Sequence, residues 1–215
     1  MYKVILFDLD GTLLDTLDDL HASVNAALAA FSYPKRTREE VRAFVGNGIA
    51  KLIERAIGSK TPDFEEVLQT FKTHYFENCM IQTKPYDGII ELLQTLQEKG
   101  VKAAVVSNKS DAAVQTLVKA YFGDLLCISV GEDEARGIHK KPAPDTLLKV
   151  LQTLQIDKSK AIYVGDSEVD IQTAQNAGIP CISVTWGFKD KEFLVKNGGE
   201  IFAETAKELL AYCIR

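Results

Sequence analysis

Four groups of polar residues stand at or just after the ends of hydrophobic runs in the sequence. They are Asp8 and Asp10; Ser107, Asn108 and Lys109; Lys141; and Asp166 with Asp170. Carboxylates in such a set can attack an electrophile or exchange protons with it, and ammonium groups can offset negative charge. The residue types therefore suggest a catalytic site that handles a charged group.

Asp8 and Asp10 are two positions apart, so on an extended chain both carboxylates point to one side, and Gly11 permits a sharp turn after them. If Asp166 and Asp170 reach the same cleft, carboxylates about 4 Å apart repel by about 4 kcal/mol at an effective dielectric constant of about 20. A cation relieves this repulsion most simply. Oxygen ligands alone favour a hard ion, Mg²⁺ ahead of Ca²⁺.

Each group also has an ordinary structural interpretation. An Asp-x-Asp pair can be a solvated turn, Ser167 or Asp166 can cap a following helix, and Ser107 with Asn108 can do the same. Lys141 alone is typical of a surface lysine. The order of the groups, each placed at a strand end, favours a shared site.

The hydrophobic runs predict the elements that position these residues. Five runs are apolar enough to be strands buried on both faces, at residues 3–7, 101–106, 125–130, 161–164 and 181–184. Segments with helical spacing separate the later runs, for example Ile89 to Leu96, which is followed by Gly100. The alternation predicts an α/β fold with an open parallel sheet, in which ligands bind beyond the carboxyl ends of the strands.

Residues 16–82 interrupt this alternation, because they contain helical patterns and no convincing strand. One apolar stripe begins at Leu17, Thr37 with Glu40 forms a capping-box signature, and a further stripe includes Phe71 and Tyr75. We therefore expect a core made of residues 1–15 and 83–215, with a helical subdomain of residues 16–82 inserted in it.

In chain order, four motifs resemble those of the haloacid dehalogenase-like hydrolase superfamily. They read Asp8-Leu-Asp-Gly-Thr12, Val106-Ser-Asn108, Lys141-Pro142 and Gly165-Asp166 followed by Asp170. The resemblance spans the predicted core, and the helical insert after the first motif resembles the type 1 cap of that family. It implies a Rossmann-like parallel sheet with a helical cap.

The resemblance also implies a mechanism. Asp8 would be a nucleophile that forms an aspartyl-phosphate, and Asp10 a general acid and then a general base. Mg²⁺ would be held by the Asp8 carboxylate, the Asp10 backbone carbonyl and Asp166. Thr12 would lie at the substrate site and orient Asp10.

The remaining motif residues would surround the phosphoryl group. Ser107 and the backbone N–H of Asn108 would bind its oxygens, and the ammonium of Lys141 would offset the charge of the transition state. Asp170 would orient the metal ligands or Lys141 from behind them.

Within the superfamily, the chain is similar to the phosphoglycolate phosphatase branch. The residues that suggest this are Asp15, the segment from Val45 to Gly48, and the triplet that ends in Lys109. Asn47 and Gly48 would contact the non-phosphate end of the substrate, with Lys109 also at the substrate site. The alternative for the glycine segment is a plain turn between helices.

Other functions stay open at this point. A sugar phosphomutase of the β-phosphoglucomutase type usually has an apolar residue where this chain has Thr12, which favours a phosphatase moderately. A pyrophosphatase or nucleotidase acts on similar groups. A catalytically idle binding module would keep the fold without the reaction.

Composition narrows the partners. The chain has 215 residues and a net charge of -5, and it contains no cluster of Lys and Arg that would track nucleic acid. No signal sequence or membrane span is evident, so we expect a cytoplasmic protein that acts on a small phosphorylated substrate. The four cysteines are far apart with apolar neighbours, which predicts buried free thiols. The sequence leaves the oligomeric state open.

Overall fold

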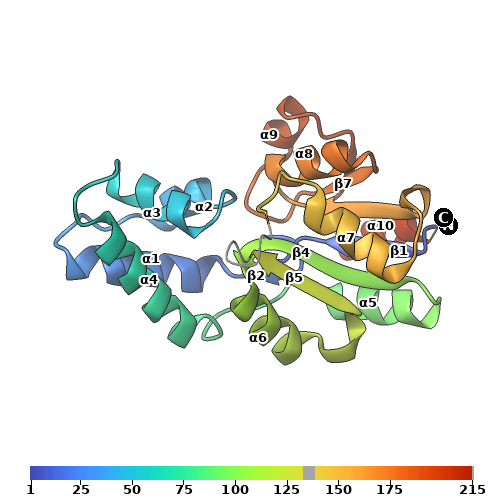
Figure 1. The fold of residues 1–215 in the computed structure, drawn as a ribbon, viewed down its shortest axis with the longest axis horizontal. Helices are drawn as coiled ribbons and strands as arrows, with labels where there is room; N and C mark the ends of the chain where they lie inside the picture. The colour runs from blue at the N-terminus through green and yellow to red at the C-terminus, as the bar shows by residue number, and fades with distance from the viewer. Residues whose placement is uncertain (133–138, 215) are drawn as a thin grey trace. The chain divides into compact units, whose positions relative to one another are not determined.

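The computed structural model describes residues 1–132 and 139–214 and divides the chain into two compact units (Figure 1). One unit comprises Met1–Leu14 and Pro85–Arg215, and the other comprises Asp15–Lys84. These limits differ by one or two residues from the boundaries that the sequence predicts. We call the first the core unit and the second the helical unit.

A parallel sheet of six strands organises the core unit and confirms the predicted fold class. Its strands in chain order are β1 Val4–Phe7, β4 Lys102–Ser110, β5 Ile128–Glu132, β6 Ala161–Gly165, β7 Cys181–Val184 and β8 Ile201–Ala203. The order across the sheet is β5-β4-β1-β6-β7-β8, and every neighbouring pair is parallel. The short strand β8 was not predicted, because three residues carry too little periodicity.

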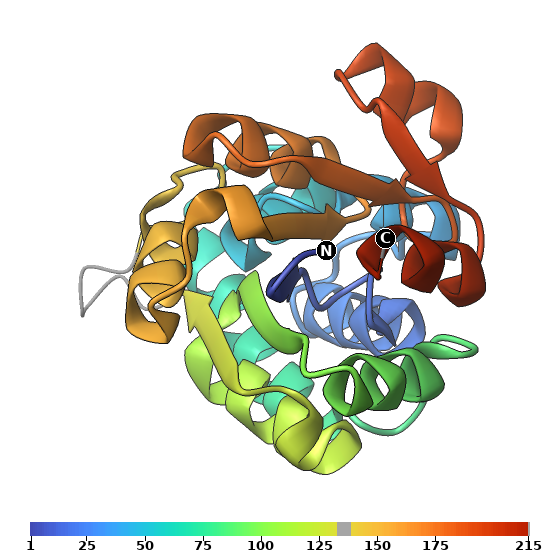
Figure 2. The same cartoon turned by 90° about the vertical axis from the view of Figure 1, so that its right-hand side faces the viewer.

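Helices cover both faces of this sheet. They are α5 Ile89–Glu98, α6 Asp111–Tyr121, α7 Asp145–Leu154, α8 Glu168–Ala177, α9 Lys191–Lys196 and α10 Ala206–Cys213. Figure 2 shows α7 and α8 on one face and the green helices α5 and α6 on the other. Alternate residues of β1 serve the two faces, and Val4 and Leu6 pack in a cluster with residues of α7 and α8. This double cover explains why the strands are hydrophobic without alternation.

The sheet register brings the predicted site residues to one edge. Phe7, the last residue of β1, pairs with Val105 of β4 and with Val164 of β6. Asp8 therefore follows at the level where β6 ends and the pairing of β4 becomes irregular. β4 extends to Ser110, four residues beyond the prediction, and its pairing with β5 shifts register between Val106 and Ser110.

The helical unit contains four helices. They are α1 Leu17–Ala30, α2 Arg38–Phe44, α3 Ile49–Ile57 and α4 Phe64–Asn78. The predicted capping box is present at α2: Thr37 Oγ1 accepts from Glu40 N at 3.2 Å, and Glu40 accepts from Thr37 N at 2.7 Å. The chain crosses between the units through β2 Leu14–Asp15 and β3 Lys84–Pro85, which form a two-stranded sheet.

Two expectations about the core need correction. Gly123, with φ 51°, turns the chain into a 3₁₀ segment at Gly123–Leu125, so β5 begins at Ile128 and not at Leu125. All four cysteines are free, but Cys127 is exposed and Cys181 is only partly buried. Apolar neighbours in sequence do not bury Cys127, because it precedes an edge strand. Among the residues that the structure describes, no helix has the length and apolar character needed to cross a membrane.

Candidate active site

Three buried carboxylates meet beyond the carboxyl ends of β1 and β6. Asp8 follows β1, Asp166 follows β6, and Asp170 lies in the first turn of α8. Each offers one oxygen to a cluster in which all such atoms lie within 4.8 Å of one another. Their exposed fractions are 8%, 1% and 0%. Buried carboxylates this close need a compensating positive charge.

Glycines make room for this cluster. A Cβ atom on Gly165 would lie 2.2 Å from Cγ of Asp170, and one on Gly187 would lie 2.4 Å from Cβ of Asp166. Gly11 has φ +81°, and a Cβ there would lie 2.3 Å from Oδ2 of Asp166. No side chain fits at these positions, so the backbone itself forms the wall against which the acids pack.

Lys141 supplies positive charge within the cluster. Its Nζ lies 2.6 Å from Asp170 Oδ1 and 2.9 Å from Asp8 Oδ1, and its exposed fraction is 7%. The contact with Asp170 is a directed hydrogen bond, whereas the contact with Asp8 is an ion pair without that geometry. Lys141 therefore binds the two acids in different ways.

Asn108 holds the backbone of Lys141. Its Oδ1 accepts from Lys141 N at 2.7 Å, and its Nδ2 donates to Lys141 O at 3.1 Å. The two bonds join the irregular end of β4 to the Lys141–Pro142 segment, whose peptide bond is cis. The predicted role of Asn108 concerned its backbone; its side chain has this additional function, which the sequence did not reveal.

Burial raises the pKa values of two acids in the cluster, and nearby negative charge raises that of the lysine. Burial raises the pKa of Asp8 to about 6 against the opposing charge of Lys141, and Asp170 and Asp10 raise it further. Burial, with the charges of Asp170 and Asp8, raises the pKa of Asp166 well above its ordinary value. For Lys141 burial acts to lower the pKa, but the charges of Asp170 and Asp8 outweigh it and hold the pKa well above the usual range. Lys141 is therefore protonated, and the acids carry unrelieved negative charge when they ionise.

Asp170 acts as both a helix cap and a lysine partner. Its Oδ2 accepts from Ser167 N at 3.1 Å and from Ser167 Oγ at 2.6 Å, in a capping box at the start of α8. Its Oδ1 accepts from Lys141. The helix cap at Ser167, which was the alternative interpretation of this motif, is therefore present in addition to the acid cluster.

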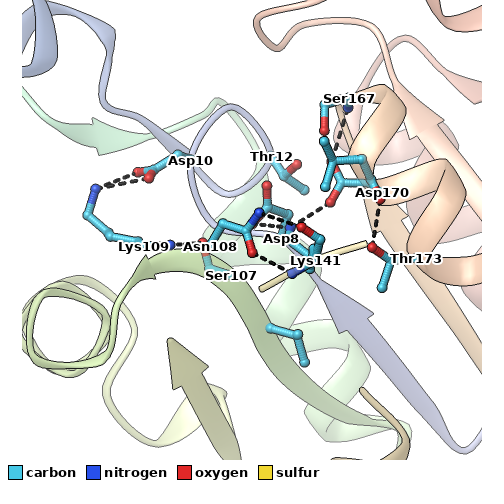
Figure 3. A network of polar contacts seen from close by, with 12 residues as sticks. Asp8, Asp10, Thr12, Ser107, Asn108, Lys109, Lys141, Ser167, Asp170 and Thr173 are labelled. Atoms are coloured by element: carbon cyan, nitrogen blue, oxygen red, sulfur yellow. Dashed lines mark hydrogen bonds and ion pairs between the residues drawn. The ribbon is translucent and has the colours of Figure 1, made fainter. Parts of the chain in front are cut away.

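The Asp10 carboxylate lies outside the acid cluster. Figure 3 shows it directed toward Lys109, away from Asp8, and Lys109 Nζ lies 3.0 and 2.9 Å from its two oxygens. The expectation that both carboxylates point to one side is therefore wrong, because the chain leaves the extended conformation at the turn where Gly11 N donates to Leu14 O. Lys109 therefore binds an acid of the chain, and its side chain is 4% exposed. Its expected contact with the substrate stays a prediction.

Thr12 contacts Asp166 in place of Asp10. Its Oγ1 donates to Asp166 Oδ1 at 3.3 Å, and Phe188 N donates to Asp166 Oδ2 at 2.7 Å. Trp186 Nε1 donates to Thr12 O at 3.1 Å, which holds the loop after β1. The sequence did not indicate this role of Phe188, because any residue type except proline can donate a backbone N–H.

Ser107 stays in the irregular part of β4. Its exposed fraction is 7%, and its Oγ accepts from Lys109 N at 3.4 Å. The hydroxyl proton remains for another acceptor. Ser107 and Asn108 do not cap α6, whose preceding residue is Ser110.

Asn47 and Gly48 lie in the helical unit, between α2 and α3. Asn47 Oδ1 accepts from Arg55 Nη2 at 2.7 Å, and Arg55 Nη1 donates to Phe44 O at 2.6 Å. Gly46 and Gly48 have φ values of 127° and 83°, which only glycine adopts without strain. Their proposed contact with a substrate stays a prediction.

The donor set of the cluster fits a hard divalent cation. Asp8 Oδ1 is buried and, among the described residues, has no hydrogen-bond donor. Asp166 is oriented by Thr12 and Phe188, as ligating carboxylates usually are by a second layer of residues. Each oxygen of Asp170 has two donors within reach, Lys141 and Tyr163 at Oδ1 and the N and Oγ of Ser167 at Oδ2, whereas each oxygen of Asp166 has one among the described residues. Asp8 and Asp166 are thus the carboxylates available to a cation, and oxygen ligands suit Mg²⁺.

Comparison with known proteins agrees with this arrangement. The family model described as haloacid dehalogenase-like hydrolase matches residues 5–184. The phosphoglycolate phosphatase of Aquifex aeolicus (strain VF5) is 36% identical over 191 residues, which cover 86% of each chain. The phosphoglycolate phosphatase of Haemophilus influenzae (strain 86-028NP) is 36% identical over 197 residues, covering 87% of each.

A solved structure extends the similarity over almost the whole chain. A crystal structure from Lactobacillus delbrueckii subsp. bulgaricus, of a protein assigned provisionally as a phosphoglycolate phosphatase, has a TM-score of 0.94 and 37% identity. It covers 99% of this chain, which in turn covers 98% of it.

Proposed function

The chain belongs to the haloacid dehalogenase-like hydrolases, and on this basis we propose that it is a magnesium-dependent phosphatase of small phosphate monoesters, with phosphoglycolate the first candidate. The relatives named as phosphoglycolate phosphatases support the choice of substrate. The reaction class has a separate support in the geometry of the site.

One observation carries the proposal: the buried oxygen Oδ1 of Asp8 lies 2.9 Å from the ammonium of a protonated lysine, Lys141, and among the described residues it accepts no aligned hydrogen bond. An oxygen in this state is not solvated, and it is available to a cation or to a phosphorus atom. The Lys141 ammonium at 2.9 Å holds the carboxylate in place and adds positive charge where phosphoryl oxygens would lie.

The reaction follows from these residues in two steps. A carboxylate oxygen of Asp8 attacks phosphorus, the bond from phosphorus to the ester oxygen breaks, and Asp10 gives a proton to the leaving oxygen. Water then attacks the phosphorus of the aspartyl-phosphate while Asp10 takes its proton, and inorganic phosphate leaves with Asp8 restored.

Other residues hold the reacting groups. When bound between Asp8, the Asp10 carbonyl and Asp166, Mg²⁺ would neutralise charge between nucleophile and phosphoryl group. The Ser107 hydroxyl and Asn108 N–H bind phosphoryl oxygens. Lys109 holds the side chain of Asp10 in a defined position before Asp10 moves to the ester oxygen.

The helical unit supplies substrate selection in this proposal. The Asn47 amide, held by Arg55, offers a polar contact for the part of the substrate beyond phosphate. As a cap, this unit would exclude bulk water while the aspartyl-phosphate forms.

The test is a phosphate-release screen of the wild type and Asp8→Asn over phosphoglycolate, sugar phosphates, nucleotides and pyrophosphate, with Mg²⁺ or with EDTA. We expect release from phosphoglycolate, loss of at least about 10³-fold without Mg²⁺ or in Asp8→Asn, and an unchanged circular dichroism spectrum of the variant. Substantial activity of Asp8→Asn removes Asp8 as nucleophile. Conversion of a sugar phosphate to its isomer, without phosphate release, identifies a mutase.

A further inference from the structure

A fully buried tyrosine lies under the charged site and has no part in the mechanism above. Tyr163 is the third residue of β6 and has an exposed fraction of 0%. It belongs to the hydrophobic cluster of the face covered by α7 and α8. Its hydroxyl, however, reaches residues of three motifs.

The hydroxyl oxygen accepts and donates at the same time. Lys141 Nζ donates to it at 3.0 Å. Its one proton has two acceptors in reach, the Val106 carbonyl at 2.9 Å and Asp170 Oδ1 at 3.2 Å. The Val106 carbonyl belongs to the residue directly before Ser107. The phenol thus connects β4, at the residue where its pairing becomes irregular, with Lys141.

These contacts decide where the Lys141 ammonium lies. Of its three close partners among the described residues, Asp170 and Tyr163 accept directed hydrogen bonds, and Asp8 makes an ion pair without that geometry. An ion pair constrains distance but little direction. Without the phenol, one directed bond remains, and the ammonium is free to pivot about Asp170.

We propose that Tyr163 is a positioning residue, whose hydroxyl, anchored on the Val106 carbonyl, directs the Lys141 ammonium toward Asp8 and the phosphoryl group. Asn108 holds the same lysine at its backbone, so that both ends of Lys141 are fixed. The proposal rests on the proposed phosphatase activity. It adds a role for a residue that touches neither substrate nor metal.

Tyr163→Phe tests this directly, because it removes the hydroxyl and retains the ring, whose centroid lies 5.6 Å from Lys141 Nζ. We expect kcat to fall by roughly 10- to 100-fold, as for a lost hydrogen bond to a charged group, with KM within about two-fold. In a Lys141→Ala background the same change should lower kcat by less than about two-fold, because the residue it acts through is absent. An equal loss in both backgrounds overturns the proposal.

A matched control separates catalysis from stability. Tyr33 also uses its hydroxyl in two contacts, with Thr61 and Asp63, but lies in the helical unit. Tyr33→Phe should lower the melting temperature and leave kcat unchanged. If it lowers kcat as much as Tyr163→Phe does, the effect is one of general stability and the proposal fails.

Nuclear magnetic resonance of ¹⁵N-labelled lysine provides a readout that does not depend on turnover. The Lys141 ammonium, assigned with Lys141→Arg, should give a slowly exchanging resonance that shifts or vanishes in folded Tyr163→Phe. If that variant does not fold, a chain labelled with 3-fluorotyrosine retains the hydroxyl as a weaker acceptor, and the resonance should still move. An unmoved resonance overturns the Tyr163 proposal alone, whereas a wild type that hydrolyses no phosphate ester overturns the proposed function.

Discussion

Two buried lysines divide the acids of the site between them. Lys141 contacts Asp8 and Asp170, and Lys109 contacts both oxygens of Asp10. The division gives the proposed nucleophile, Asp8, and the proposed acid and base, Asp10, different lysine partners, so that their environments differ. Burial makes the Asp8 anion less stable than its contact with Lys141 alone would make it.

Asp8→Asn should raise stability by an amount that depends on pH. Burial raises the pKa of Asp8 to about 6 in the folded protein, above that of the unfolded chain, so the folded state binds the proton more tightly. Ionisation of Asp8 therefore costs the wild type on the order of 3 kcal/mol of stability as pH rises from about 4 through about 6, and Asp8→Asn lacks this contribution.

Urea unfolding in EDTA at pH 4.5 and 7.5 measures this difference. The exposed Glu98, replaced by Gln, is the control and should show no such dependence. A stability gap of equal size at both pH values contradicts the raised pKa.

Lys109→Met should lower kcat by about 10-fold with KM nearly unchanged, because Asp10 loses its ion pair with Lys109 while its carboxyl group remains. Steady-state phosphate release measures both constants, and Lys119→Met, at an exposed position of α6, is the control. A raised KM with unchanged kcat would favour direct binding of substrate by Lys109, as the sequence suggested.

Among the strands, turns and helices, the site depends on glycine backbone that packs closely against the Asp166 and Asp170 carboxylates. β1 and β6 end at the same level, and the glycines around Asp166 and Asp170 allow main chain to approach where a side chain would clash. α8 begins at the same point, and its capping box uses Asp170, so that the start of a helix and the position of Lys141 depend on one residue.

Gly187→Ala should displace Asp166, because the new methyl group would lie 2.4 Å from Asp166 Cβ and from Gly11 O. We expect Mg²⁺ affinity to fall by about 10- to 100-fold and kcat to fall with it. Calorimetric titration of Mg²⁺ and phosphate release measure the two effects.

Gly100→Ala is the matched control, since a Cβ there meets nothing within 4 Å although φ is +69°. It should cost about 1 kcal/mol of stability and leave Mg²⁺ binding unchanged. Equal behaviour of the two alanine variants would mean that backbone strain, and not the contact with Asp166, sets the effect.

Across the whole molecule, the proposed function assigns catalysis to the core unit and substrate selection to the helical unit. The core unit contains the three acids of the cluster, Lys109, Lys141 and Tyr163. The helical unit contains Asn47. β2 and β3 pair with each other, so the two chain segments that lead into and out of the helical unit lie side by side.

A chain in which a short glycine and asparagine linker replaces residues 16–83 should fold, because the six-stranded sheet has its own buried core. We expect it to bind Mg²⁺ and to hydrolyse p-nitrophenyl phosphate, but to lose its preference for one small ester over another. Circular dichroism, Mg²⁺ titration and the substrate screen measure these properties. Retained selectivity would place substrate recognition in the core unit.

The class of fold, the order of most elements and the strand ends that carry the candidate site residues could be predicted from the amino-acid sequence alone. These follow from local hydrophobic pattern and from motifs such as Asp8-Leu-Asp-Gly-Thr12, which survive whatever the packing. Only the tertiary structure decided that Asp10 turns to Lys109, that Thr12 serves Asp166, and that Tyr163 connects Val106 with Lys141. The physical reason is that the direction of a side chain, and the partner it meets far along the chain, depend on turns, register and burial that residue type does not encode.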